Sequence, residues 1–262
     1  MTLRVCVLAS GSSGNCTYVG SDRTQLLVDA GLSGREIGAR LESIGVRAED
    51  IDAVCLTHEH DDHRASLGVL QRRYGTALYA NAGTIDGVQR DRRLQGLPWN
   101  VFTTGSAFMI GDLTIEPFSV PHDSYDPVGF AVSAGTLRVG IVTDMGMATS
   151  LVRERLKQCR VLVIESNHDE EMLRDSPRPW SLKQRIAGRQ GHFSNAQAAA
   201  LVTELAGDHL DSVLLAHLSA DCNRPELAME AVRRALREGG YPEVDVYVTF
   251  PDRPTQVVAI EG

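Results

Sequence analysis

The chain has 262 residues, of which 43% are hydrophobic and 23% are charged, and its formal net charge is −8. This composition is typical of a folded globular protein and excludes a disordered or fibrous chain. The acidic balance also argues against a protein that coats nucleic acid through a broad basic surface.

Short apolar runs alternate with amphipathic helical patterns along the whole chain. Some runs, such as Val161–Glu165, are almost entirely apolar, which is typical of strands buried on both faces. The alternation predicts one layered α/β domain over residues 1–262. The predicted strands are Leu3–Ala9, Gln25–Asp29, Ile51–Thr57, Ala77–Ala80, Leu113–Val120, Gly129–Ala134, Leu137–Thr143, Val161–Glu165, Ser212–Ala216 and Val244–Phe250.

Two predicted helices begin with a capping box, Ser33 with Glu36 and Ser194 with Gln197. Segment 172–193 contains two prolines, a tryptophan and five basic residues, and we predict a long surface loop or a short irregular helix there. The predicted helices are Ser33–Gly45, Ser66–Tyr74, Thr84–Arg92, Thr149–Gln158, Asn195–Leu205 and Asn223–Gly240.

The sequence predicts a cytoplasmic protein that does not cross or bind a membrane. No apolar run approaches the roughly 20 residues that a membrane helix needs, and the first residues lack the pattern of a signal peptide. The five cysteines are odd in number and form no C-x-x-C pair. This usage favours reduced, buried thiols over a disulfide framework.

The strongest chemical signal is the run His58–His63, which reads HEHDDH and follows a predicted buried strand. Three imidazoles and three carboxylates so close together would have conflicting pKa values unless a cation were bound among them. Neutral imidazole and carboxylate are the usual protein ligands of zinc and similar metals. We therefore predict a metal site here. The alternative for such a run is a solvated polar loop.

More candidate ligands recur where later strands end. His122, Asp144 and His217 each follow a predicted strand, Glu165 ends another, and His168 comes shortly after it. Functional residues gather at one end of a sheet because the loops there converge on a crevice. We therefore expect these side chains to join the run at one site.

The pattern H-x-H-x-D-H, followed by a lone His, a lone Asp and a lone His, resembles the ligand pattern of the metallo-β-lactamase-fold hydrolases. The segments Ser10–Asn15, Glu165–Asp169, Gly191–Asn195 and His217–Ser219 are similar to those of the YycJ/WalJ/VicX subfamily, regarded as 5′→3′ DNA exonucleases. The resemblance covers nearly the whole chain, although the proline and tryptophan content of Asp175–Trp180 does not match it. It implies an α/β fold, the four-layer αβ/βα metallo-β-lactamase sandwich.

The resemblance also implies a site with two divalent metal ions, for which Zn, Mn and Fe all suit the ligands. Asp144 would bridge the two ions, and Asp61 would be a solvated or supporting carboxylate rather than a ligand. The ligands of the first ion would be His58, His60 and His122, and those of the second Asp62, His63 and His217.

In the implied mechanism, a hydroxide shared by the two metals attacks the phosphodiester, and Asp62 orients it or acts as its base. His192 is the candidate general acid for the leaving oxygen, with Glu165 or His168 holding its ring. For His192, an ordinary polar residue before a helix cap is the alternative.

Two segments are candidates for contact with a phosphate substrate. Glycines in the loop 10–15 allow close backbone approach, although a plain β-turn would use them equally well. Basic residues of segment 172–193 would form a local positive rim, the alternative being a solvated basic loop. The candidate substrate-binding residues are Ser10, Ser12, Ser13 and Asn15 in the first segment, and Lys183, Arg185 and Arg189, with Arg174 and Arg178 nearby, in the second.

We therefore expect a metal-dependent phosphodiesterase, a 5′→3′ exonuclease that acts on DNA ends or nicks, with RNA as a second possible substrate. An RNA endonuclease or a hydrolase of small phosphodiesters or thioesters with the same fold is the alternative. A non-catalytic regulatory metalloprotein is a third hypothesis, which the intact ligand set weighs against. The sequence does not predict an oligomeric state.

Overall fold

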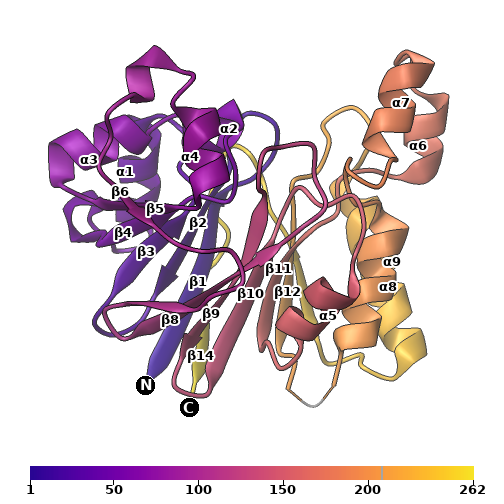
Figure 1. Cartoon of the computed structure of the whole chain (residues 1–262). Helices are drawn as coiled ribbons and strands as arrows, with labels where there is room; N and C mark the ends of the chain where they lie inside the picture. Colours follow the sequence, from indigo (N-terminus) through magenta and orange to yellow (C-terminus); the bar gives the residue numbers. More distant parts are fainter. Residues whose placement is uncertain (208) are drawn as a thin grey trace.

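A computed structural model describes residues 1–207 and 209–262. Two sheets of seven strands face each other, and helices cover the outer side of each sheet (Figure 1). Both chain ends lie at the lower edge of the sheets in this view, close to the ends of β1 and β14. The arrangement confirms the four-layer αβ/βα sandwich that the resemblance implies.

The first sheet pairs the two ends of the chain and then runs outward through the first hundred residues. Its strands β1 to β3 are antiparallel, whereas β3 to β6 are parallel. In spatial order the strands are β14 (Val258–Glu261), β1 (Thr2–Ala9), β2 (Cys16–Gly20), β3 (Gln25–Val28), β4 (Ala53–Cys55), β5 (Ala77–Ala80) and β6 (Trp99–Val101).

The second sheet repeats this plan, because β7 to β10 are antiparallel and β10 to β13 are parallel. In spatial order its strands are β13 (Asp245–Val248), β12 (Ser212–Ala216), β11 (Val161–Glu165), β10 (Leu137–Val142), β9 (Val128–Ala134), β8 (Leu113–Ser119) and β7 (Phe108–Ile110). Parallel strands end at the same edge of a sheet, so the loops that carry the candidate ligands lie together.

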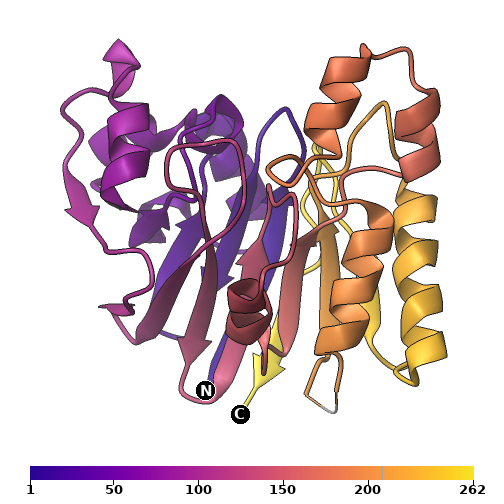
Figure 2. The ribbon, with the colours of Figure 1, turned by 45° about the vertical axis from the view of Figure 1, so that its right-hand side comes forward.

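The helices fall into three groups. On the first sheet lie α1 (Gly34–Ser43), α2 (Asp61–Arg64), α3 (Leu67–Tyr74) and α4 (Ala82–Val88), with short 3₁₀ turns at Ala48–Asp50 and Arg92–Leu94. On the second lie α5 (Ser150–Leu156), α8 (Asn195–Leu205) and α9 (Pro225–Gly239), while α6 (Glu170–Asp175) and α7 (Trp180–Ile186) form a hairpin above the sheet edge (Figure 2). None of the helices described in residues 1–207 and 209–262 has the length and apolar character to cross a membrane.

Three apolar layers hold the sandwich together, one between the sheets and one between each sheet and its helices. Strand β1 shows how one strand contributes to two layers. Its residues Leu3, Val5 and Val7 face the second sheet, whereas Cys6 and Leu8 face the helices. Successive side chains of a strand point to opposite faces, and both faces are buried here, which explains the nearly continuous apolar runs in the sequence.

Most predicted elements are present, and both capping boxes are confirmed at the starts of α1 and α8. The prediction of a loop or a single irregular helix over 172–193 is wrong, because the segment forms most of α6 and all of α7. Asp169 caps α6 through the backbone amides of Glu171 and Met172, and Pro179 stands at the N-cap of α7. A proline at a helix start loses no hydrogen bond, so it begins this helix rather than preventing it.

Four strands were not predicted: β2, β6, β7 and β14. Two of them, β6 and β7, have only three residues each and are outermost in their sheets, where one side of a strand lacks a partner. Strand β14 lies in the proline-containing tail and pairs with β1 at the opposite end of the chain. Local patterns do not reveal such pairings, because the partner strand supplies the hydrogen bonds.

A substitution at Phe130 can test how much the apolar layer between the two sheets contributes to stability. Phe130 is fully buried and packs edge-to-face on Phe102, with ring centroids 5.8 Å apart. We expect Phe130→Ala to lower the free energy of unfolding by about 3–5 kcal/mol, because the cavity cannot close between two sheets. Val101→Ala, at a side chain that is 63% exposed, is the control and changes it by less than about 0.5 kcal/mol. Urea unfolding measures both, and equal effects would contradict this core.

Candidate metal centre and active site

All seven predicted ligands converge where the central strands of the two sheets end. The run His58–His63 follows β4, His122 follows β8, Asp144 follows β10 and His217 follows β12. Their nitrogen and oxygen atoms form groups in which all ligand atoms lie within 4.8 Å of one another. The groups are His58 with His60 and His122; Asp62 with His63 and His217; His58 with His63 and Asp144; and Asp144 with Glu165, His192 and His217.

Four atoms of this cluster are buried and have no hydrogen-bond partner in the described part of the chain. They are the Nε2 atoms of His58, His122 and His217 and the Oδ2 atom of Asp144. The nearest charged group to Oδ2 of Asp144 is Nε2 of His63, another candidate ligand, at 3.1 Å. A buried polar atom without a partner costs free energy, so native proteins rarely leave one. Imidazole nitrogens and carboxylate oxygens suit divalent metal ions, and the donor set therefore fits such ions well.

In four of the five candidate ligand histidines, the protein holds the Nδ1 atom of the ring. Such contacts fix the orientation of a metal-ligating ring. The Nδ1 atom of His63 lies 2.7 Å from the Asp29 carboxylate, and that of His217 lies 2.8 Å from Glu165. The Nδ1 atoms of His58 and His122 lie 3.0 Å from the Thr57 hydroxyl and 3.2 Å from the carbonyl of Gly191. Sequence analysis did not single out Asp29, although it too ends a predicted strand.

The backbone takes unusual conformations at this cluster. Asp29, Asp144 and His217 have positive φ angles of 64°, 52° and 55°, and they are three of only four non-glycine residues with positive φ in the described chain. Left-handed backbone is uncommon for residues with a side chain and gathers at functional sites. Gly31 has a related role, because a Cβ atom there would lie 1.7 Å from the carbonyl oxygen of Asp62. Only glycine lets these loops pass so closely.

Burial and charge set the protonation of the cluster. Burial and nearby imidazoles hold the pKa of His58 well below its usual value, and burial also lowers the pKa of His122. Both rings are therefore neutral, which is the metal-binding form. Burial alone would lower the pKa of His217, but surrounding carboxylates, Asp144 foremost, raise it to about 10. Negative charge thus dominates this part of the cluster, and a cation would balance it.

Glu165 connects His192 to the cluster. Its Oε1 atom lies 2.8 Å from Nδ1 of His192 and also 2.8 Å from Nδ1 of His217. Burial alone would raise the pKa of Glu165, but the two imidazoles hold it at about 2, so the carboxylate is ionised. His168, the other predicted partner of His192, lines a separate cavity, and no hydrogen bond joins the two rings among the described contacts.

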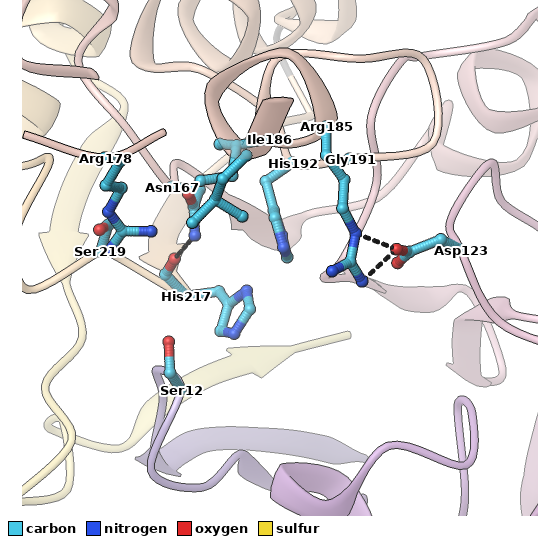
Figure 3. A pocket seen from close by; sticks show the side chains of 11 residues that line it. Ser12, Asp123, Asn167, Arg178, Arg185, Ile186, Gly191, His192, His217 and Ser219 are labelled. Atoms are coloured by element: carbon cyan, nitrogen blue, oxygen red, sulfur yellow. Dashed lines mark hydrogen bonds and ion pairs between the residues drawn. The ribbon is translucent and has the colours of Figure 1, made fainter. Parts of the chain in front are cut away.

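A cavity of about 190 Å³ opens over His192 and His217 (Figure 3). The His192 ring points into it, and Ser12 faces it from the loop between β1 and β2. Arg178 and Arg185 reach it from the α6–α7 hairpin. The cavity therefore offers an anionic substrate two guanidinium groups and a hydroxyl beside the candidate metal ligands.

Each of these arginines is paired with a carboxylate from another loop. Nε of Arg185 donates to Asp123 over 2.7 Å, and Nη2 of Arg178 donates to Asp221 over 2.9 Å. The other predicted basic contacts lie elsewhere. Lys183 lies on the far side of α7, and Arg189 lines a neighbouring cavity that it shares with Arg185.

The four candidate substrate-binding residues of loop 10–15 lie in two different environments. Ser12 and Ser13 are exposed, whereas Ser10 and Asn15 are buried. The Ser10 hydroxyl accepts a hydrogen bond from the backbone amide of His217 over 2.7 Å and donates to Asn15 over 3.0 Å. The Asn15 amide donates to Asp62 over 3.2 Å. Ser10 and Asn15 thus hold the ligand loops, and Ser12 is the side chain of the four that lines the cavity.

Comparison with known proteins agrees with this geometry. A family model described as a β-lactamase superfamily domain matches residues 24–218. Exodeoxyribonuclease YycJ of Bacillus anthracis is 37% identical over 263 residues, which cover 98% of this chain and 99% of that protein. Exodeoxyribonuclease WalJ of Streptococcus pneumoniae is 36% identical over 260 residues, with 97% of each chain covered.

Solved structures share the architecture at much lower sequence identity. The metallo-β-lactamase fold protein YhfI from Bacillus subtilis has a TM-score of 0.75 at 18% identity, with 99% of each chain covered. The short form of human tRNase Z has a TM-score of 0.64 at 15% identity, with 97% of this chain and 98% of that chain covered. These likenesses concern the fold, while the family model and the full-length relatives are closer in sequence. The chain therefore belongs to the metallo-β-lactamase superfamily, in the subfamily of the YycJ and WalJ proteins.

Proposed function

We propose that the protein is a metal-dependent exodeoxyribonuclease that degrades DNA from its 5′ ends. The observation that carries the proposal is the set of four buried, unpartnered ligand atoms at the strand ends. Relatives that are 36–37% identical over nearly the full length of both chains bear the name exodeoxyribonuclease. Together these observations favour a metal-assisted attack on phosphodiester bonds of DNA.

Two divalent ions, Zn, Mn or Fe, fit the ligand groups. His58, His60 and His122 would hold one ion and Asp62, His63 and His217 the other, with Asp144 shared between them. When bound, such ions polarise a phosphoryl oxygen and make water a stronger nucleophile. Asp62 is the carboxylate of the second group and is partly exposed, and Asn15 donates a hydrogen bond to its Oδ2 atom. It is therefore placed to orient the attacking water.

The Glu165–His192 pair supplies the proton that the leaving oxygen needs. Glu165 engages Nδ1 of His192 and leaves Nε2 of that ring for the substrate side of the cavity. Burial would lower the pKa of His192, but the charge of Glu165 outweighs it and raises the pKa, so the ring carries a proton to donate. A positioned acid of this kind contributes roughly 10²–10⁴-fold to a proton-transfer reaction.

The rim of the cavity would hold the DNA backbone. Ser12, Arg178 and Arg185 face the space beside the candidate ligands, and both arginines are kept extended by their carboxylate partners. Exposed ion pairs contribute only about 0–1 kcal/mol, so a phosphate group can replace Asp123 or Asp221 at little cost. These contacts would involve only a short stretch of the DNA backbone, which agrees with an acidic protein that acts at DNA ends.

Linear and circular DNA separate exonuclease from endonuclease action. We expect the protein with Mn²⁺ or Zn²⁺ to release nucleotides from linear DNA and to leave covalently closed circles intact. A 5′ label should appear first in the mononucleotide fraction, whereas a 3′ label should remain on long fragments until late. EDTA abolishes the activity and added metal restores it. Cutting of closed circles, or a preference for RNA of equal sequence, would contradict the proposal.

Measurements of metal binding alone can test the contacts that orient the candidate ligands. Asp29→Asn weakens the contact that orients His63, and we expect the metal affinity to fall roughly 10–100-fold. His63→Ala removes a ligand and should leave about one ion per chain in place of two. Elemental analysis and metal titration measure both changes. Asp61→Asn is the control, because its side chain is 85% exposed; a loss of metal as large as that of Asp29→Asn would contradict the ligand assignment.

The acid role of His192 predicts a dependence on the leaving group. His192→Gln should lower kcat on DNA by roughly 10²–10⁴-fold, because the leaving sugar oxygen then lacks its proton donor. On a p-nitrophenyl phosphodiester, whose leaving group departs without a proton, the loss should be far smaller. The metal content should equal that of the wild type. Equal losses on both substrates would show that His192 does not act as the acid.

A further inference from the structure

A second cavity lies on the far side of α7 from the metal centre and plays no part in the mechanism above. Its volume is about 230 Å³, and its accessible walls are mostly carbon. It lies within the α6–α7 hairpin and includes Trp180, in the segment whose proline and tryptophan content does not match the sequence resemblance. It is lined by His168, Glu170, Leu173, Arg174, Trp180, Lys183, Gln184 and Ala187.

Helix α7 forms a wall between the two cavities. Residues 180, 183, 184 and 187 line the second cavity, at the spacing that places side chains on one face of a helix. Residues 182, 185 and 186 line the metal cavity from the other face. A strand whose phosphate lies at the metal centre therefore has this second cavity only one helix away.

Trp180 gives the cavity a flat apolar surface. Its side chain is 68% exposed, more than any other large hydrophobic side chain in the described chain. Exposing an indole to water is unfavourable unless a partner covers it. Aromatic side chains stack on nucleobases with little regard to sequence, because every base has a π-face.

His168 also lines this cavity, and one nitrogen of its ring has no partner in the described chain. The residue is only 2% exposed, and its Nδ1 atom has no hydrogen-bond partner in the described chain. A ligand with donors and acceptors along one edge and flat apolar faces would suit both His168 and Trp180. A nucleobase has this combination.

The charge around the cavity is suited to the backbone that would carry such a base. Arg174 and Lys183 stand at its wall, and Nζ of Lys183 donates to the carbonyl of Arg174 over 2.6 Å, which holds α6 and α7 together. Arg178 and Arg185 lie on the side of the metal cavity. The hairpin, residues 170–186, carries four basic and three acidic side chains, a net charge of +1 on an acidic protein, and Glu170 is the acidic residue at this cavity.

We propose that this cavity binds one unpaired nucleobase of the substrate strand, with Trp180 stacking on the base and His168 bonding to its edge. The proposal rests on the proposed function, because it assumes that a DNA strand is already bound with a phosphate at the metal centre. Base binding around α7 would hold a frayed, single-stranded end in place while its phosphodiester is cut.

Binding without cleavage tests the cavity directly. The chain has two tryptophans, so Trp99→Phe leaves Trp180 as the only indole reporter. In EDTA, a short oligodeoxyadenylate should quench its fluorescence, whereas an oligomer of equal length with abasic sites should not. Both Trp180 variants lack this reporter, so their binding is followed by the fluorescence anisotropy of an end-labelled oligodeoxyadenylate. Trp180→Ala should weaken binding roughly 5- to 150-fold, and Trp180→Phe should retain most of it. Met109→Ala, at another exposed apolar side chain on β7, is the matched control and should not weaken binding.

Kinetics with metal separate this proposal from the proposed function. Trp180→Ala should raise the KM for single-stranded DNA by a similar factor, and leave the KM for the abasic oligomer unchanged. If the wild type degrades DNA but Trp180→Ala alters neither binding nor KM, the base site is wrong and the nuclease stands. If the wild type degrades no DNA, the nuclease is wrong, and the fluorescence titration still decides whether the cavity binds a base.

Discussion

The structure depends on a small group of buried polar atoms that the chain leaves without partners. Nitrogens of three histidines and one oxygen of Asp144 meet where the two sheets end, and none of the four has a hydrogen bond. The rings cannot turn away, since their other nitrogens are held by the Thr57 hydroxyl, the carbonyl of Gly191 and the Glu165 carboxylate. A bound cation would satisfy these atoms together, so metal binding would contribute to the energetics of the fold as well as to catalysis.

The two-sheet architecture explains how distant segments build this group. Each sheet ends in parallel strands, and the loops after β4, β10, β11 and β12 therefore open on one crevice. Left-handed backbone at Asp29, Asp144 and His217 turns the chain sharply there. These conformations are costly for residues with side chains, and the packed strands behind them hold them in place.

The positions of the basic side chains explain how an acidic protein could bind the anionic substrate that we propose. The α6–α7 hairpin carries arginines over the metal cavity on one face and Trp180 over a second cavity on the other. The arginines are kept ready by Asp123 and Asp221, and these pairs are weak enough for phosphate to replace the carboxylates. The DNA binding that we propose would thus be confined to a few nucleotides beside the candidate metal ligands.

The sequence by itself determined the layered α/β class, the metal-ligand motif and most strands, because buried strands are apolar throughout and the His58–His63 run has no simpler explanation. Tertiary structure decided what depends on long-range partners. Strand β14 exists only through pairing with β1, and Asp29 became important only when its carboxylate met His63. Likewise Lys183 and Arg185 look equivalent in the sequence, yet they lie on opposite faces of α7, since side-chain direction follows the helix once that helix has docked.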